Sequence, residues 1–150
     1  LLDALSGLFK DKEEFDLTLL LITHDFPIAA AFADRIGVMY AFQLVEKGNA
    51  DEVLQDPDHP YMRMMARTTL DLETPIDDPV KIEGSTPDPI NVPSGCSFHP
   101  RCPLADDRCE VEEPVLSAEE GDDHEVACFY PDLAKEQIPL TIADEEGDSQ

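Results

Sequence analysis

Apolar residues in the first 55 positions change from a helical to a strand-like pattern and back. The leucines and the phenylalanine of residues 1–9 recur at helical spacing, whereas residues 17–22 (LTLLLI) form one continuous apolar run. A short run without polar alternation is typical of a strand buried on both faces, as in a parallel sheet. The elements predicted in this part are helices over 1–14, 25–34 and 50–55, and strands over 17–22, 35–40 and 43–46. This order predicts the end of an α/β domain.

The regular pattern ends near residue 71. Residues 56–57 (DP) break the short helix, and residues 59–61 (HPY) open another. Five prolines within residues 74–95 predict an extended connector. The predicted organisation is an α/β part over 1–71, a connector over 72–95, a cysteine-rich extension over 96–131, and an acidic tail over 132–150. The composition of the tail predicts disorder.

The charge of the chain excludes some partners. With 34 acidic and 10 basic residues, the formal net charge is −24. Such a chain repels phosphates, which argues against nucleic acid and against unaided binding to an anionic membrane surface. Acidity along the whole chain is typical of a protein from a high-salt cytoplasm, where screening weakens self-repulsion. The alternative is an acidic mesophilic protein with a disordered tail.

The ends and the apolar runs indicate the compartment. No apolar run approaches the roughly 20 residues that span a bilayer, and the first residues lack the basic region of a signal peptide. The chain begins Leu-Leu, so we expect a fragment or a processed product. Without a secretory signal, metal binding is favoured over disulfides.

All four cysteines of the chain lie in the extension, at Cys96, Cys102, Cys109 and Cys128. Four thiolates suit a tetrahedral zinc ion or an iron–sulfur cluster, and four thiols also suit two disulfides. The spacing C-x₅-C-x₆-C-x₁₈-C lacks the C-x₂-C pairs of common zinc modules and differs from the ferredoxin runs. A metal would stabilise a module too small for a core of its own.

Other side chains near the cysteines have simpler expected roles. His99 and His124 could replace a cysteine as a metal ligand, but we expect both to be solvated loop residues. We expect Arg101 and Arg108 to offset thiolate charge in this acidic chain.

His24 follows the predicted strand over 17–22 directly. Open α/β sheets bind ligands at the carboxyl ends of their strands. A lone histidine in such a place is more often structural, so this signal is weak by itself. Asp25 is suited to N-cap the following helix, with Pro27 in its first turn.

Several motifs, which follow one another in a fixed order, resemble those of a known protein family. LLLITHD is similar to the strand and switch-histidine loop of ABC transporter ATPases, and ADRIGVMYAFQLVEKG to the strand pair that follows. DPDHPYMR, the Pro-rich connector and GCSFHPRCPLADDRC resemble the C-terminal parts of the oligopeptide/dipeptide importer subfamily. The resemblance covers about residues 1–130, with Phe42 standing where the family usually has glycine.

The resemblance implies a fold and a set of roles. The fold would be α/β: the C-terminal part of a P-loop ABC ATPase domain, followed by a small irregular Cys-rich metal-binding extension. His24 would contact the ATP γ-phosphate, with Asp25 beside it. Cys96, Cys102, Cys109 and Cys128 would hold a [4Fe-4S] cluster, with zinc as the alternative metal.

The implied function is that of the ATP-binding subunit of a peptide importer, which works with ATP and Mg on the cytoplasmic face of the cell membrane. Its partners would be a second ATPase subunit, identical or paralogous, transmembrane permease subunits and, indirectly, a substrate-binding protein. The acidity predicts a halophilic archaeon as the source.

Parts of the ATPase machinery are absent from these 150 residues. The chain has no G-x-x-x-x-G-K-[ST], no LSGGQ segment and no strand ending in Asp-Glu. We therefore expect the fragment alone to be inactive. The alternative function is a stand-alone iron–sulfur or zinc module with a structural or regulatory role, and a secreted disulfide-linked protein is a third reading.

Overall fold

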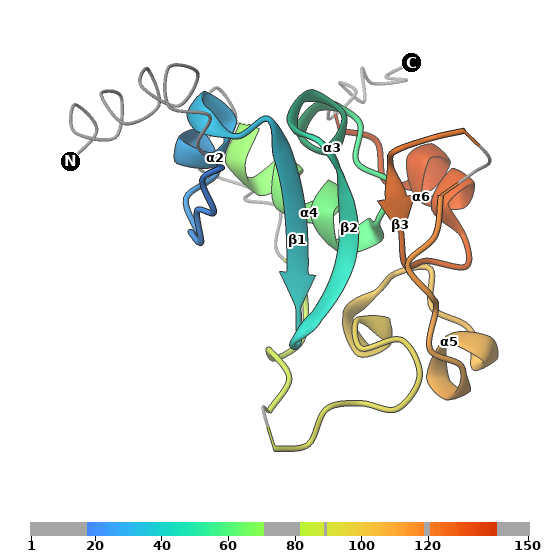
Figure 1. Cartoon of the computed structure of the whole chain (residues 1–150). Coiled ribbons are helices and arrows are strands. Elements are labelled where there is room, and N and C mark those ends of the chain that lie inside the picture. The colour runs from blue at the N-terminus through green and yellow to red at the C-terminus, as the bar shows by residue number, and fades with distance from the viewer. Residues whose placement is uncertain (1–17, 71–81, 89, 119–120, 141–150) are drawn as a thin grey trace, which may run out of the picture. The chain divides into compact units, whose positions relative to one another are not determined.

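The structure is a computed structural model that describes residues 18–70, 82–88, 90–118 and 121–140 (Figure 1). The predicted helix over 1–14 lies outside these residues, as do the connector segment 71–81 and the tail segment 141–150. Contacts divide the chain into two compact units, residues 1–34 and residues 35–150. Among the described helices, none is long and apolar enough to cross a membrane.

The described part of the first unit contains helix α2 (Phe26–Phe32). The Asp25 carboxylate accepts a hydrogen bond of 3.1 Å from the backbone N–H of Ile28, and Pro27 lies in the first turn. The predicted N-cap is therefore confirmed. The predicted strand over 17–22 is wrong for residues 18–22, which have no regular secondary structure in the described part of the chain. A buried strand needs neighbours on both sides, and Leu20 and Ile22 are instead 87% and 90% exposed.

The second unit is built on an antiparallel sheet of order β1-β2-β3. Its strands are β1 (Arg35–Tyr40), β2 (Gln43–Asn49) and β3 (Glu125–Val126). β1 has the predicted bounds and β2 continues three residues further than predicted. The parallel sheet expected from the apolar run is thus not present in the described residues. β3, which lies about 80 positions further along the chain, pairs with β2 of the long hairpin.

The turn between β1 and β2 has an unusual composition. Ala41 and Phe42 both have positive φ, 45° and 68°, as a two-residue hairpin loop of type I′ requires. Glycine or asparagine normally fills such positions, because an L side chain in this region costs about 1–2 kcal/mol. Phe42 is 71% exposed. The turn is therefore as tight as one with glycine, although the sequence departs from the family pattern here.

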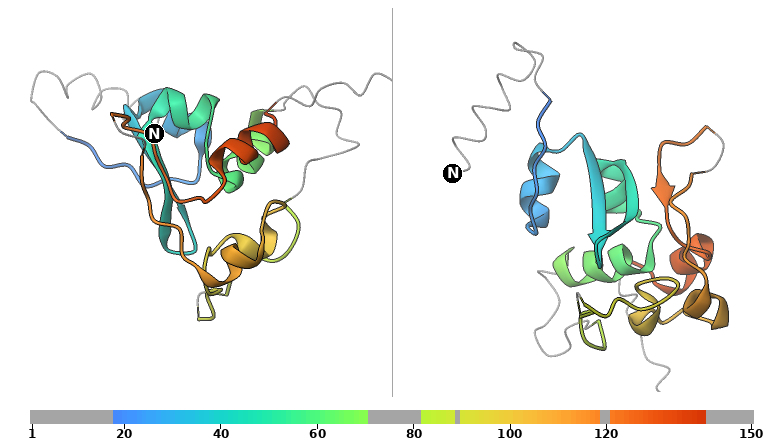
Figure 2. Two further views of the ribbon diagram at one scale, coloured as in Figure 1. Left: turned by 90° about the vertical axis from the view of Figure 1, so that its right-hand side faces the viewer. Right: turned by 60° about the horizontal axis from the view of Figure 1, so that its bottom comes forward.

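Short helices complete the second unit. They are α3 (Ala50–Gln55), α4 (Pro60–Leu70), a 3₁₀ turn (His99–Arg101), α5 (Asp107–Val111) and α6 (Pro131–Gln137). α4 and α6 pack side by side, as both views of Figure 2 show. The predicted disorder over 132–150 is thus wrong for residues up to 140: Ala134 and Ile138 are buried against the rest of the unit.

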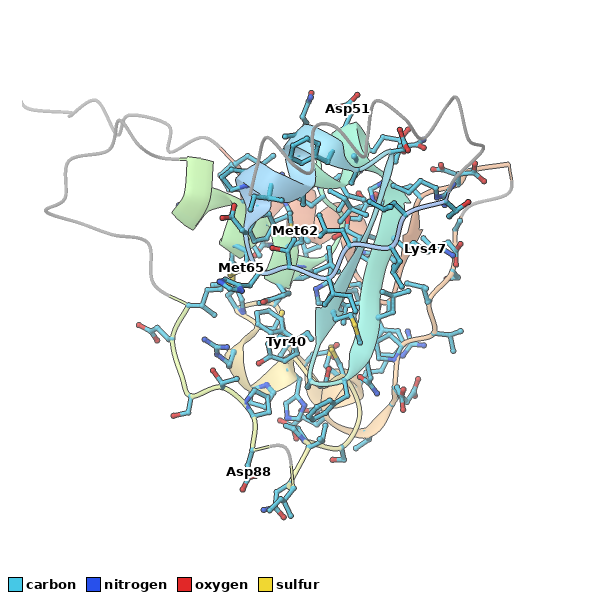
Figure 3. All side chains as sticks on the ribbon, turned by 60° about the vertical axis from the view of Figure 1, so that its left-hand side comes forward. Tyr40, Lys47, Asp51, Met62, Met65 and Asp88 are labelled. Carbon is cyan, nitrogen blue, oxygen red and sulfur yellow. The ribbon has the colours of Figure 1, made fainter. Side chains whose placement is uncertain are left out.

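The cysteine-rich extension shares its core with the hairpin. Phe98, which is fully buried, packs edge-on against Tyr40 of β1 with ring centroids 5.1 Å apart. Tyr61 of α4 lies 4.7 Å from Tyr40 and 5.4 Å from Phe98. Tyr40, labelled in Figure 3, lies beside the segment that carries the cysteines. Aromatic contact of this kind means that the extension cannot move without disturbing β1.

Candidate functional site

The four cysteines of the extension line one small cavity. Cys96, Cys102, Cys109 and Cys128 border a space of about 20 Å³, together with mostly apolar and aromatic side chains. None of the four forms a disulfide; Cys109 is buried and the others are half-buried. The fold therefore gathers all four predicted ligands around a common space, and the disulfide alternative is not realised in this structure.

The spacing of the sulfur atoms separates a single ion from a larger group. A tetrahedral zinc ion holds thiolates at about 2.3 Å, which places neighbouring sulfurs about 3.8 Å apart. No three cysteines in the described part of the chain bring their sulfur atoms within 4.8 Å of one another. A four-iron cluster binds its cysteines at its outer corners and needs sulfurs that are farther apart. The four thiols therefore form a donor set around one space, without the close tetrahedral spacing of a bound zinc ion.

The first cysteine is placed by a close approach of two backbone segments. The N–H of Cys96 donates a hydrogen bond of 2.8 Å to the carbonyl of Cys109. Gly95 precedes it with φ +67°, and a Cβ on this residue would lie 2.4 Å from the Cys109 carbonyl oxygen. Only glycine fits here, because both the conformation and the space exclude a side chain. Two ligand-bearing segments are thus joined directly through their backbones.

Burial of the thiols favours their neutral form. It raises the pKa of Cys102 to about 12 and the pKa of Cys128 to about 11. Burial also raises the pKa of Cys96 and of Cys109. Without a bound cation the four groups would therefore be thiols at neutral pH, and metal binding would release protons.

The two arginines near the cysteines donate hydrogen bonds to other groups. Arg101 donates to the carbonyls of Ile82 and Glu83, which fixes the connector to the extension. Arg108 donates to Glu112 and covers the ring of Phe129. Neither of these contacts is made with a cysteine, and the expectation that the two arginines offset thiolate charge stays a prediction.

A buried carboxylate connects the extension to the strand hairpin. Glu46 of β2 is fully buried and accepts hydrogen bonds from the backbone N–H groups of Asp58, at 2.6 Å, and His59, at 3.1 Å. Its Oε1 also lies 2.7 Å from Nε2 of His124. Burial raises the pKa of Glu46, against the lowering effect of these hydrogen bonds. One side chain thus joins β2, the start of α4 and the loop before β3.

Sequence reasoning missed Glu46. Its partners Asp58 and His59 lie 12 and 13 positions further along the chain, beyond α3, so no short-range pattern indicates the pairing.

The HPY segment that opens α4 has a structural role. His59 is 1% exposed, and its Nδ1 accepts a hydrogen bond of 3.1 Å from the N–H of Tyr61. The ring also bonds to the backbone of Ala127, one residue before the last cysteine. Burial lowers the pKa of His59 to about 3, so its ring is neutral in the folded protein.

The other histidines of the extension are less solvated than we expected. His124 is only 9% exposed and is paired with Glu46, so the expectation of a solvated loop residue is wrong. His99 is half-buried, with Nδ1 2.9 Å from the carbonyl oxygen of Cys96.

Glu46, Asp58 and His124 form the most compact group of potential metal ligands among the described residues, within 4.8 Å. Lys135 already supplies a cation there, 2.6 Å from Asp58, so this group is explained without a metal.

His24 and Asp25 belong to the other unit. His24 is exposed and directly precedes α2, while Asp25 caps that helix. The structure therefore gathers the four cysteines into one place, and it leaves the predicted nucleotide contact on a separate unit.

Comparison with known proteins identifies the family. Residues 45–109 match the family described as "Oligopeptide/dipeptide transporter, C-terminal region". The chain is 39% identical over 132 residues to the oligopeptide transport ATP-binding protein AppD of Bacillus subtilis (strain 168), which covers 87% of this chain and 40% of the relative. This chain contains the C-terminal region of an oligopeptide/dipeptide ABC transporter ATP-binding protein.

Two further relatives of this ATP-binding family are similarly close. The dipeptide transport ATP-binding protein DppD of Escherichia coli (strain K12) is 37% identical over 120 residues, covering 80% of this chain and 36% of the relative. The dipeptide transport ATP-binding protein DppF of Haemophilus influenzae (strain ATCC 51907 / DSM 11121 / KW20 / Rd) is 34% identical over 122 residues, covering 81% of this chain and 37% of the relative. The chain thus spans about two fifths of the length of these curated relatives.

The residues that match the transporter family include the elements that Glu46 connects. It begins in β2, next to Glu46, and ends at Cys109. It therefore contains the buried carboxylate, the HPY segment and three of the four cysteines, whereas Cys128 lies beyond it. The small mixed α/β domain described here corresponds to this C-terminal region.

The buried neutral ring of His59 predicts a pH dependence of stability. Between pH 6.5 and about 3, the unfolded chain binds a proton that the folded chain does not. The free energy of unfolding should therefore fall as the pH is lowered through this range, by up to about 1.4 kcal/mol per pH unit. His59→Gln, which keeps hydrogen-bonding groups but does not titrate, should flatten this dependence in urea unfolding at pH 7, 6 and 5.

The matched control is His24→Gln, at an exposed histidine, which should retain the dependence of the parent chain. An equal slope in His59→Gln and the parent would contradict the assignment.

Proposed function

We propose that this chain is part of the ATP-binding subunit of a peptide importer, in which ATP binding and hydrolysis drive uptake through a membrane permease. The observation that carries this proposal is 34–39% identity, over 80–87% of the chain, to ATP-binding proteins named for oligopeptide or dipeptide transport. The complete subunit would pair with a second ATPase, identical or paralogous, on the cytoplasmic face of the membrane. A substrate-binding protein would deliver the peptide to the permease.

We assign His24 to the γ-phosphate of ATP in the complete subunit. A neutral imidazole can donate a hydrogen bond to a phosphate oxygen, and phosphoryl transfer depends mainly on positioning and charge stabilisation. The exposure of His24 supports this role, as does its place directly before a helix that Asp25 caps. Asp25 would fix the loop next to the nucleotide. The groups that hold the phosphates and Mg would come from other parts of the subunit.

His24→Ala in the complete subunit, assembled with its partners, should lower ATP hydrolysis by about 100-fold, as expected for the loss of one positioned donor. ATP binding, measured by equilibrium titration, should remain. Gln55→Ala, at an exposed position of α3, is the control and should keep full turnover. Normal hydrolysis in His24→Ala would exclude the role.

We further propose that Cys96, Cys102, Cys109 and Cys128 hold a [4Fe-4S] cluster. Four free thiols around one cavity provide the donor set, and cysteine thiolates are the ligands that hold iron–sulfur clusters. When bound, the cluster would supply metal–thiolate bonds that connect segments far apart in the sequence. The chain itself excludes water with Phe98 and Phe129 and joins the site to β1 through Tyr40. These contacts favour a structural role.

Metal analysis of the chain tests this assignment directly. After anaerobic purification in high salt, which a net charge of −24 favours, we expect about four irons and four acid-labile sulfides per chain. Cys128→Ser should lose most of both, whereas Ser85→Ala, at an exposed serine of the connector, should keep them. One zinc per chain and no iron would contradict the cluster.

A further inference from the structure

Two of the four cysteines are connected by a pair of side chains, Asp106 beside the cavity and Tyr130, which borders it. Asp106 is the N-cap of α5, and its Oδ1 accepts hydrogen bonds of 3.1 Å from the N–H groups of Arg108 and Cys109. Its other oxygen, Oδ2, accepts a hydrogen bond of 2.5 Å from the hydroxyl of Tyr130. Asp106 therefore binds both the helix turn that carries Cys109 and a residue next to Cys128.

Tyr130 extends this connection to the sulfur of Cys128. Its backbone N–H donates to Cys128 Sγ at 3.3 Å. N–H to sulfur bonds orient thiolate ligands and adjust the electron density that they supply to a metal. A single tyrosine thus orients Cys128 through its backbone and reaches the Cys109 helix through its side chain.

A second contact runs parallel to the first. The guanidinium carbon of Arg108 lies 3.8 Å from the centroid of the Phe129 ring, and its Nε donates to Glu112 at 2.8 Å. Both Arg108 and Phe129 are direct neighbours of a cysteine. Stacking of a cation on an aromatic face adds to the attraction between the same two segments.

The contacts between the Cys109 and Cys128 segments matter because the two cysteines are far apart in the sequence. Nineteen positions separate it from Cys109, so bringing the two together has an entropic cost that other contacts must offset. The Ser117–Val126 bridge shortens the intervening segment on one side. The Asp106–Tyr130 hydrogen bond joins the residues that flank this segment.

We propose that Asp106 and Tyr130 are positioning residues of the four-cysteine site, which set the separation of Cys109 and Cys128 and thereby retain the bound cluster. This inference rests on the proposed iron–sulfur cluster. The Asp106–Tyr130 bond lies at the surface, where a single hydrogen bond adds little to the overall stability. Its loss should therefore affect cluster retention much more than the unfolding temperature.

Tyr130→Phe in the cluster-containing 150-residue chain is the decisive variant, because it removes only the hydroxyl. We expect chelator-driven loss of the cluster's visible absorption to be about tenfold faster than in the parent, as for loss of a hydrogen bond to a charged acceptor. The thermal unfolding temperature should change little. Tyr61→Phe is the matched control: no hydrogen bond of that hydroxyl occurs among the described residues, so cluster loss should keep the parent rate.

A second variant separates positioning from helix capping. Asp106→Asn keeps a good N-cap but offers a weaker acceptor to Tyr130, so it should also accelerate cluster loss. The double variant should lose the cluster no faster than the quicker single variant, because both remove the same contact. Additive effects would contradict the proposal.

The outcomes distinguish this inference from the cluster assignment. A parent chain that never binds iron and sulfide would overturn both. A parent that holds the cluster, with Tyr130→Phe releasing it at the parent rate or Tyr61→Phe releasing it equally fast, would overturn the positioning role alone.

Discussion

A buried carboxylate holds the second unit of this protein together. Glu46 has no solvent exposure, yet its two oxygens accept hydrogen bonds from Asp58 and His59, directly before α4, and pair with His124. Burial of an unpaired carboxylate would be strongly unfavourable, and these three partners offset that cost. Because they come from separate parts of the chain, the carboxylate connects the hairpin, the junction helix and the extension. The cavity with the cysteines lies next to this connection, since His59 contributes to both.

This arrangement explains why the extension is not an independent module. Phe98 lies between the first two cysteines and is buried against Tyr40. Arg63 of α4 is likewise buried and donates at 2.7 Å to the carbonyl of Ile138, beyond the last cysteine. A site built in this way is fixed to the strand hairpin.

Local rules predicted the local features of the structure. The Asp25 cap, the bounds of β1 and the start of α4 at Pro60 each depend on residues close in sequence. The cysteines were predicted as one set because their residue type limits what they can do. Their common cavity agrees with that prediction, although the spacing alone left the metal open.

Two of the failures have a common cause in contacts between residues far apart in the sequence. Glu46 and His124 are 78 positions apart, and no local pattern relates them. α6 was predicted as part of an acidic tail because the burial of Ala134, and of Ile138 just after the helix, depends on packing against distant parts of the chain such as α4. The run over 17–22 was misread for the opposite reason, since a buried strand needs a sheet that the described residues do not supply.

Native-state hydrogen exchange of four backbone amides tests the central role of Glu46 most directly. The N–H groups of Asp58 and His59 bond to Glu46, while those of Cys96 and Ala127 bond within the extension and to β2. If Glu46 makes these parts one cooperative unit, all four amides should exchange through an opening of the same free energy. Glu46→Gln should lower that free energy for all four together. Fast exchange at Cys96 and Ala127, with Asp58 and His59 still protected, would contradict the account.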